Sequence, residues 1–566
     1  MWITKKEAYN IDYVNKTPKK LSDLLHYHTA EGNLGFVMKI FSYNCDLNAK
    51  DDNGNTPLHI AVLKKHLGVT RILLVLGANP NILNKKGETP RHIAANLVNS
   101  NFIHTLIIGG ASRCSSSTVG CKVGCMNENL LEEVNDDVSL YNSFKELEKM
   151  KNNKLLNQKR QDEIYEGMME ALKNMGNMND ARNYINVLSL DGGGIRGLVS
   201  LQLLSEIEKM IGEPVFQYFD WVIGTSTGAI IAAALAKGKS ISDCQKLYLR
   251  FKDSVFNKKN KTPKLRTIAL SNFLHKEMGT ETCLSNVPWP RLIFTTVKID
   301  EPVGHRTKLI RNYQFHSSNN EGDLPLVKAL QMSSAAPTYF DAVDNVYIDG
   351  GGVGSNNPLQ DLLTEINQWN LDKSESEKVK IGCAISIGTG IAPSVQQLKS
   401  LNFSGGLMGL ITTIKSYINF VKWATATEGR TVEHTFAQCS TSGIPFFRFN
   451  PPLSKDVPLD TTNDFALAEM MWESFVYAKM NQEQIKKMAL LLKEIGPSFS
   501  RKQFFKKIPQ LFPFSPVKAY IDSIKSNDPD IRLVGLKKLR ESLTNRSRCN
   551  DIVLCGMMEP QIIVNL

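Results

Sequence analysis

Short apolar runs alternate with helical stripes in the middle of the chain. The runs are residues 186–190 and 219–223, and a glycine-rich turn follows each of them. After the first turn, five apolar residues recur at helical spacing: Leu198, Leu201, Leu204, Ile207 and Ile211. After the second turn, residues 229–237 form an alanine-rich helical segment. Because strands and helices alternate here, we predict an α/β domain.

The first 112 residues carry a repeat with an offset of 33 residues. The sequence TPLH at 56–59 recurs as TPRH at 89–92, and the Gly-Ala pair at 77–78 recurs at 110–111. This unit resembles the ankyrin repeat, which implies helix pairs with a protruding turn. We predict about three copies over residues 20–112, the first of them degenerate. His59 and His92 are expected to stabilise the turns and not to bind a ligand.

The remaining segments are more polar or more basic. Residues 113–183 are predicted to be a helical linker, with helical patches at 140–156 and 161–175. Residues 497–516 are predicted to be a basic, aromatic linker. Residues 517–566 contain three short helical patterns and resemble part of an armadillo-type repeat. The predicted fold class is therefore multidomain: all-α ankyrin repeats, an α/β domain and a short all-α C-terminal segment.

Composition favours a soluble chain that stays in the cytoplasm. The longest uncharged stretch near the middle, residues 221–236, is shorter than the roughly 20 residues that a membrane-spanning helix needs. Charges interrupt the first 14 residues, where an export signal would need an apolar run. The ten cysteines are therefore expected to remain thiols. The net charge of +11 admits nucleic acid or an anionic membrane as a partner and does not choose between them.

Three cysteines lie close together in the linker, at Cys114, Cys121 and Cys125. Their spacings fit no zinc-binding template, and no histidine lies between them. We therefore predict that they bind no metal.

The sequence Gly-Thr-Ser-Thr-Gly at 224–228 lies between a predicted strand and a predicted helix. This context is typical of a nucleophile elbow, a sharp turn that exposes a serine. Small neighbours such as Gly224 and Gly228 are needed because the turn is strained. Ser226 is the predicted nucleophile.

The other glycine-rich turn, DGGGIRG at 191–197, allows two interpretations. Its glycines at 192, 194 and 197 match the dinucleotide-binding pattern GxGxxG. That pattern needs an acidic residue about twenty positions later at a strand end, but Glu213 precedes a proline where no strand ends. Alternatively, the backbone N–H groups of the turn stabilise a developing oxyanion.

A nucleophilic serine needs a base, and two residues are candidates. Asp349 ends a predicted strand, residues 346–349, that runs into a glycine turn 123 residues after Ser226. His434 is the only histidine after residue 320, and no glycine turn presents it. Asp349 is therefore the stronger candidate.

Together, these motifs resemble the patatin-like phospholipase family. The match covers five motifs in the family's order and spacing: DGGGIRG at 191–197, GTSTG at 224–228, SSAAP at 333–337, DGG at 349–351 and NNP at 356–358. It spans about 187–372, with the fold completed near 496, which implies a three-layer α/β hydrolase domain. The ankyrin repeats ahead of it resemble the calcium-independent phospholipase A(2) branch.

The resemblance implies a Ser–Asp dyad without histidine, in which Ser226 is the nucleophile and Asp349 the base. It also implies that the backbone N–H groups of Gly192, Gly193 and Gly194 form the oxyanion hole. Supporting positions follow from the same motifs: Arg196, Gly197, Gly224, Gly228, Gly350 and Gly351. No cofactor and no metal are implied.

The predicted function is hydrolysis of acyl esters of membrane glycerophospholipids through an acyl-enzyme, in the cytoplasm and peripheral to membranes. The alternatives are an inactive ankyrin and armadillo scaffold, or a neutral-lipid hydrolase. Two segments, residues 401–423 and 501–520, are candidates for membrane contact, and such segments also resemble calmodulin targets. The ankyrin repeats could bind a protein partner or mediate self-association. No nucleic-acid partner is expected.

Overall fold

The structure is a computed structural model. It describes residues 18–114, 121, 125, 158–174, 184–392 and 428–496, apart from residues 281, 288, 300–305, 316–323 and 354. The two candidate membrane segments, the helical patch at 140–156 and the armadillo-like segment lie outside these residues. Among the described residues, no helix is both long and apolar enough to cross a bilayer.

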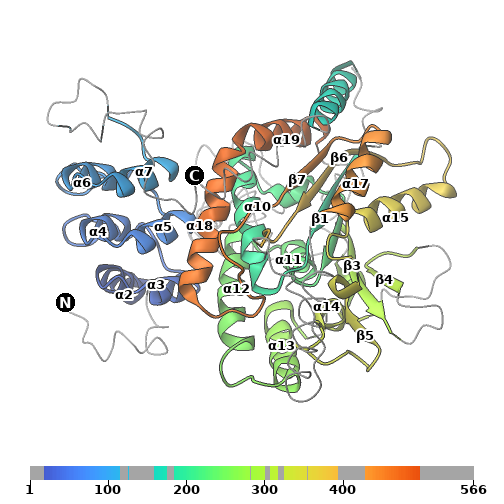
Figure 1. Ribbon diagram of the computed structural model, residues 1–566, viewed down its shortest axis with the longest axis horizontal. Helices are drawn as coiled ribbons and strands as arrows, with labels where there is room; N and C mark the ends of the chain where they lie inside the picture. Colours follow the sequence, from blue (N-terminus) through green and yellow to red (C-terminus); the bar gives the residue numbers. More distant parts are fainter. Residues whose placement is uncertain are drawn as a thin grey trace, which may run out of the picture.

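The N-terminal part is a stack of three helix pairs (Figure 1). The pairs are α2 (Pro18–Ala30) with α3 (Leu34–Phe41), α4 (Pro57–Leu63) with α5 (Leu67–Val75), and α6 (Pro90–Asn96) with α7 (Ser100–Ile108). The TPxH motif begins α4 and α6. Thr56 and Thr89 are the N-caps, and the rings of His59 and His92 accept hydrogen bonds from the cap N–H groups at 3.1 Å.

Residues 184–496, the α/β domain, are built on one mixed sheet, which has seven strands among the residues that the structure describes. The strands are β1 (Tyr184–Leu190), β2 (Trp221–Thr225), β3 (Arg291–Lys298), β4 (Arg306–Arg311), β5 (Tyr347–Asp349), β6 (Lys380–Ile387) and β7 (Phe446–Phe449). Their order is β4-β3-β2-β1-β6-β7, and β5 pairs antiparallel with β3. Leu190 at the end of β1 aligns with Gly224 of β2 and Ile387 of β6, so three parallel strands end together.

Helices cover both faces of this sheet, because alternate residues of the central strands face opposite cores. In β1, Leu188 and Leu190 join the larger core, whereas Ile185 and Val187 join the smaller one. The larger core contains α10 (Gly197–Ile211), α11 (Thr227–Ala236), α12 (Ile241–Val255), α13 (Pro263–Met278), α14 (Leu326–Ser334), α18 (Asp464–Met480) and α19 (Gln482–Ile495).

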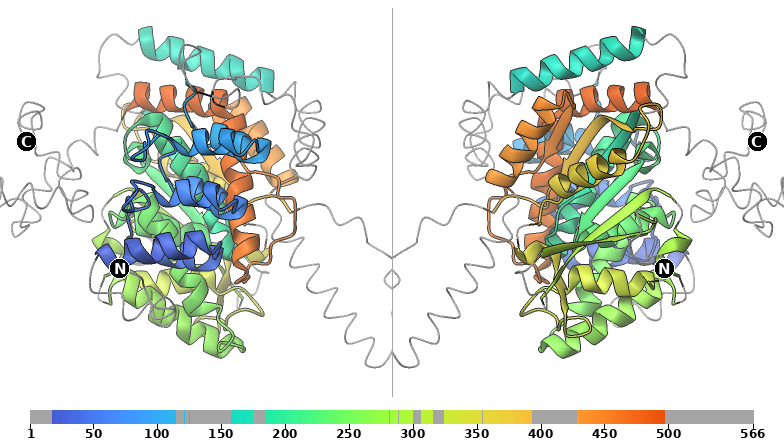
Figure 2. Two further views of the ribbon diagram at one scale, coloured as in Figure 1. Left: turned by 90° about the vertical axis from the view of Figure 1, so that its left-hand side faces the viewer. Right: turned by 90° about the vertical axis from the view of Figure 1, so that its right-hand side faces the viewer.

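The smaller core packs α15 (Leu359–Leu371) and α17 (Arg430–Thr441) on the opposite face of the sheet. Figure 2 shows α15 and the ankyrin array on opposite sides of the molecule. Within the described part of the domain there are also short 3-10 helices: η3 (Gly194–Arg196), η4 (Val215–Tyr218), η5 (Leu284–Asn286) and η7 (Gly350–Val353). The predicted fold class, ankyrin repeats followed by a three-layer α/β domain, is confirmed.

The ankyrin array packs on the α/β domain through the second helices of its pairs. Helices α3 and α5 contact α18, and α3 also contacts α12. The buried residues of both parts form one hydrophobic core cluster. At its edge, Lys246 donates a hydrogen bond to Asn44 at 2.6 Å, and Arg250 donates one to the carbonyl of Ser42 at 3.1 Å. The short array therefore buries one face against its neighbour instead of exposing it.

A helix over residues 158–174 lies in the predicted linker and packs on the sheet edge. Gln161 accepts a hydrogen bond from the N–H of Phe446 at 2.8 Å, and its amide donates to Ser440 at 3.1 Å. Lys487 of α19 pairs with Asp162 at 2.7 Å. This part of the linker is therefore attached to the α/β domain.

Candidate active site

Ser226 lies on a strained turn between β2 and α11. Its backbone has φ 55° and ψ −115°, which a residue with a side chain rarely adopts. The turn is tight, because a Cβ atom on Gly224 would lie 2.5 Å from the backbone N of Ala229, and one on Gly228 would lie 2.2 Å from the carbonyl oxygen of Leu190. The glycines of GTSTG are thus required by close backbone approach, as the elbow interpretation expects.

Two hydrogen bonds hold this turn. The N–H of Ser226 donates to the hydroxyl of Ser333 at 3.0 Å, and Ser333 is fully buried at the end of α14. The hydroxyl of Thr227 donates to the carbonyl of Gly194 at 2.8 Å. The second bond connects the serine turn to the other glycine-rich turn.

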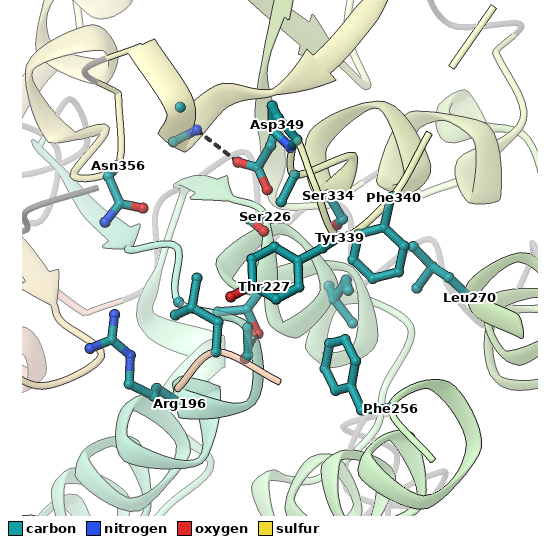
Figure 3. Close-up of a pocket in the computed structure, with 18 of the residues that line it drawn as sticks. Arg196, Ser226, Thr227, Phe256, Leu270, Ser334, Tyr339, Phe340, Asp349 and Asn356 are labelled. Atoms are coloured by element: carbon teal, nitrogen blue, oxygen red, sulfur yellow. Dashed lines mark hydrogen bonds between the residues drawn. The ribbon is translucent and has the colours of Figure 1, made fainter. Parts of the chain in front are cut away.

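Asp349 faces Ser226 from the end of β5 (Figure 3). Its side chain is buried and accepts a hydrogen bond from the N–H of Gly351 at 2.8 Å. Burial raises the pKa of Asp349 to about 6, although hydrogen bonds from Ser226 and Gly351 oppose the shift. Because of its burial, the Asp349 carboxylate thus has a higher proton affinity than usual.

The glycine after Asp349 allows a close approach of two strands. A Cβ on Gly350 would lie 2.2 Å from the hydroxyl of Thr295 on β3, so this glycine lets β5 approach β3 closely.

Two of the three glycines predicted as the oxyanion hole line the same pocket as Ser226. These are Gly193 and Gly194. The N–H of Gly192 instead donates a hydrogen bond to the carbonyl of Asn356 at 3.1 Å. The N–H of Gly192, which was predicted to belong to the oxyanion hole with those of Gly193 and Gly194, thus already has a backbone partner. The turn is held in place by Thr389, whose hydroxyl donates to the carbonyl of Gly192 at 2.8 Å.

The residues that follow this turn are buried beside the pocket. Arg196 lines the pocket, and burial lowers the pKa of its guanidinium against the opposing charges of Asp456 and Tyr339. Gly197 begins α10, and a Cβ there would lie 2.6 Å from the hydroxyl of Thr227.

Glu213 is the acidic residue that the dinucleotide interpretation would need. It is exposed in the turn after α10, where it accepts a hydrogen bond from Tyr218 at 3.1 Å.

A buried ion pair lies directly before the glycine-rich turn and connects it to β7. Asp191, fully buried directly before Gly192, accepts a hydrogen bond from Arg448 of β7 at 2.7 Å. Arg448 also donates to the hydroxyl of Ser386 at 2.8 Å and to Glu428 at 3.1 Å. Burial lowers the pKa of the Arg448 guanidinium, but the charges of Asp191 and Glu428 outweigh burial and raise it above its ordinary value.

The sequence motifs did not single out Arg448, the partner of Asp191. It is a charged residue in the otherwise aromatic β-strand Phe446–Phe449. A charge at a strand position between buried aromatic residues is a signal that the sequence contained, because such a charge needs a partner.

The pocket beside Ser226 is largely apolar. Ser226, Asp349 and the glycine turn lie at one end, and aromatic and aliphatic side chains from several elements form the walls: Ile230, Phe251, Phe256, Leu270, Tyr339, Phe340 and Leu459. Figure 3 shows Leu270, Phe256 and Phe340 on the side of the pocket away from Arg196. An acyl chain is the kind of group that such walls accept.

No histidine lines this pocket within the described residues. His434, the alternative base, lies exposed on α17, on the face of the sheet opposite to α11. The described side chains that could together hold a metal ion also lie elsewhere, in the ankyrin region. Among the described residues, the pocket thus offers a serine, one carboxylate and the glycine turn for chemistry, with the guanidinium of Arg196 and the hydroxyls of Ser334 and Tyr339 also in its lining.

Comparison with known families agrees with the architecture. Residues 188–363 match the family model described as patatin-like phospholipase, and residues 42–94 match the model for ankyrin repeats. The chain therefore carries a patatin-like phospholipase domain preceded by ankyrin repeats, which confirms the family that its motifs resemble.

Several curated proteins are similar over long stretches. An intracellular phospholipase A2 of Caenorhabditis elegans is 34% identical over 480 residues, which are 81% of this chain and 43% of that protein. An 85/88 kDa calcium-independent phospholipase A2 of Rattus norvegicus is 33% identical over 345 residues, 55% of this chain and 41% of that protein. A calcium-independent phospholipase A2-gamma of Homo sapiens is 28% identical over 333 residues, 55% of this chain and 40% of that protein. The chain thus spans less than half the length of these relatives.

Proposed function

We propose that this protein is a lipid acyl ester hydrolase that releases fatty acid from membrane glycerophospholipids without calcium. The observation that supports this most is the position of Ser226, on a strained turn beside the buried Asp349 at the end of an apolar pocket. The names of the similar proteins agree with the proposal. An inactive scaffold would have no need for a complete site of this kind, and strain at a turn persists where function requires it.

The reaction uses the dyad twice. The Ser226 hydroxyl oxygen attacks the ester carbonyl carbon while Asp349 accepts the hydroxyl proton. The N–H groups of Gly193 and Gly194 stabilise the negative oxygen of the tetrahedral intermediate. The intermediate collapses, the alcohol oxygen takes the proton from Asp349, and the lysophospholipid leaves an acyl group on Ser226.

Water then completes the cycle. It attacks the acyl carbonyl and gives one proton to Asp349, and the second intermediate expels the serine oxygen. Ser226 regains its proton from Asp349, and the fatty acid leaves. A carboxylate with an ordinary pKa near 4 is a weak base for an alcohol. Burial of Asp349 therefore supports its role, since burial raises its proton affinity.

The full chain should be incubated with position-labelled phosphatidylcholine and, separately, with triacylglycerol. Release of fatty acid from phosphatidylcholine is the expected result. Faster release from triacylglycerol would make the protein a neutral-lipid hydrolase. If neither lipid is cleaved and Ser226 does not react with a fluorophosphonate, the scaffold alternative holds.

We expect hydrolysis to be unchanged by a calcium chelator. The described residues of the pocket include a single carboxylate, Asp349, whereas a calcium loop supplies several oxygen ligands. The rate should be compared in chelator, in chelator with excess Ca²⁺ and in chelator with excess Zn²⁺. Loss of activity that Ca²⁺ restores and Zn²⁺ does not would contradict the proposal.

We expect the rate on a soluble ester to rise with pH through about 6 and then to level off. The pKa of Asp349 is raised to about 6, and Asp349 acts as a base only when deprotonated. Because a histidine titrates near 6.5, the position of this limb alone does not identify the group. If the rate of His434→Ala rises over the same pH range, the titrating group is Asp349. If this rise disappears in His434→Ala, the group is His434.

The described surface that best fits a lipid bilayer is the start of α13. Leu265 and Ile268 are 45% and 49% exposed there, and Leu270 on the same helix lines the pocket. Four exposed lysines lie in or just before this turn: Lys258, Lys259, Lys261 and Lys264. Apolar side chains among lysines favour an anionic membrane surface. We infer that this surface holds the pocket at the membrane.

Replacing Leu265 and Ile268 by serine should weaken binding to anionic vesicles about tenfold or more, because apolar burial and surface charge act together. The rate on a soluble ester should stay the same. Leu371→Ser is a matched control, since Leu371 is 78% exposed at the end of α15. Equal vesicle binding by the double variant and the control in a sedimentation assay would rule out this surface.

A further inference from the structure

Four potential metal ligands meet at the end of the ankyrin array. They are His92 of α6 and the cysteines Cys114, Cys121 and Cys125 that follow α7. Their ligand atoms all lie within 4.8 Å of one another, and the Sγ atoms of Cys114 and Cys121 lie 3.1 and 3.5 Å from Nε2 of His92. In a tetrahedral zinc site, metal bonds of about 2.0–2.3 Å place ligand atoms about 3.5–3.8 Å apart. The four side chains are thus close to the required arrangement.

The spacing of residues did not connect His92 with the three cysteines, because the histidine lies 22 residues before the first of them. His92 was expected to be a structural residue of the TPxH motif, and the cysteines were expected to bind no metal. The structure shows that the first expectation is incomplete. The Nδ1 atom of His92 serves the motif, but its Nε2 atom faces the thiols.

The repeat itself shows what is unusual here. In the two earlier copies, Nε2 of His26 lies 3.2 Å from the carbonyl oxygen of Asn55, and Nε2 of His59 lies 3.0 Å from that of Glu88. Each carbonyl belongs to the residue 29 positions later. The residue 29 positions after His92 is Cys121, which presents its thiol instead. In the first two copies, a backbone carbonyl therefore lies next to Nε2 of the histidine. In the last copy, the thiol of Cys121, a metal-binding group, lies there instead.

A second substitution falls at the same place. Leu58 of the TPLH motif is fully buried, and its counterpart Arg91 is also buried, at 3% exposure. The charge of Arg91 interacts with Cys114 and Cys125. Zinc bound by three thiolates and one neutral imidazole carries a net charge of −1, which a buried guanidinium offsets.

We propose that His92, Cys114, Cys121 and Cys125 bind one structural zinc ion that closes the end of the ankyrin array. Three thiolates and one imidazole form a closed tetrahedral shell, which is typical of structural sites. The metal bonds attach the segment after α7 to the start of α6. A backbone hydrogen bond from the N–H of Cys114 to the carbonyl of Cys125, at 3.1 Å, already joins the two ends of this segment.

Zinc ligation determines the proton positions on His92. Binding through Nε2 places the ring proton on Nδ1, where the hydroxyl of Thr89 accepts it from 2.7 Å. The N–H of Thr89, which donates to Nδ1 at 3.1 Å, then loses that bond. One neutral hydrogen bond is weak compared with a zinc–thiolate shell, so the exchange favours the metal.

The full-length protein, purified in a reducing buffer and supplied with Zn²⁺, should retain one zinc per chain by mass spectrometry. Replacement by Co²⁺ should give a thiolate charge-transfer band and the visible absorption of tetrahedral cobalt. Cys114→Ser and Cys121→Ser should each weaken metal retention at least tenfold. Cys45→Ser is a matched control, because Cys45 is also a partly buried thiol of the array but lies outside the group.

A measurement on the unmodified chain does not depend on how the variants fold. Bound zinc should protect these three cysteines from alkylation, and a strong chelator should expose them. Three results would overturn the proposal: less than 0.1 zinc per chain after reloading at about equal concentrations, unchanged zinc retention in both serine variants, or a disulfide between two of the cysteines in the reduced preparation. Hydrolysis of a soluble ester by Cys114→Ser should match that of the wild type, which separates this site from the proposed catalytic one.

Discussion

Replacing Ser226 by alanine or Asp349 by asparagine is expected to abolish hydrolysis, whereas His434→Ala should keep the rate within a few-fold. Loss of a general base typically costs about 10²–10⁴ in rate, and loss of the nucleophile removes the acyl-enzyme route altogether. His434 is exposed on α17 and does not line the pocket. Initial rates on a soluble ester are the measurement. A thousandfold loss in folded His434→Ala would replace the dyad by a triad.

Thermal unfolding provides the control for Asp349→Asn. The pKa of Asp349 is about 6 in the folded protein and near 3.8 when unperturbed, so the folded state binds the proton more tightly. Stability is then expected to fall as pH rises from about 4 to 6, because the charged form is disfavoured by burial. At pH 7.5, asparagine removes this buried charge, and the variant should be at least as stable as the wild type. An inactive variant with a lower melting temperature would leave misfolding as the cause.

Arg448→Met is expected to destabilise the catalytic domain by about 3–5 kcal/mol and to lower activity strongly. Removing one partner of a buried ion pair leaves the other charge uncompensated, and Asp191 has no exposed surface. The effect reaches the active site because Asp191 directly precedes the glycine turn that lines the pocket. Denaturant unfolding and rates on a soluble ester would measure both effects.

Two further variants separate this pair from charge removal in general. Combining Asp191→Asn with Arg448→Met removes both charges and should recover at least half of the lost stability. Lys455→Met breaks an exposed pair with Glu469, 2.9 Å apart, and should change stability little. If Arg448→Met behaved like Lys455→Met, the buried pair would not anchor the glycine turn.

Local patterns were enough to predict the elements that carry the site. The strand, turn and helix around Ser226 were predicted within about two residues, because a buried strand, a turn of small residues and an alanine-rich helix each have a clear pattern. Asp349 was predicted for the same reason, since a short strand runs into its glycine turn. The ankyrin copies followed from their 33-residue offset.

Contacts between distant segments could not be predicted in this way. The pairing of Arg448 with Asp191 spans 257 residues, and that of Gly192 with Asn356 depends on how a loop closes over the sheet. Such partners are determined by the order of strands in the sheet, which a single sequence does not reveal. The histidine beside the three cysteines was missed for a related reason, because a stacked repeat brings a residue to the one 29 positions later.

The packing of the ankyrin array on the α/β domain determines which surfaces of the array remain open to a partner. Helices α3 and α5 lie against α18, while the first helices of the pairs, α2, α4 and α6, lie on the far side of the array from the sheet (Figure 1). A protein docked on those first helices does not have to touch the catalytic domain. None of the described residues that line the pocket belongs to the array, so a protein bound to these first helices would leave the lining of the pocket untouched.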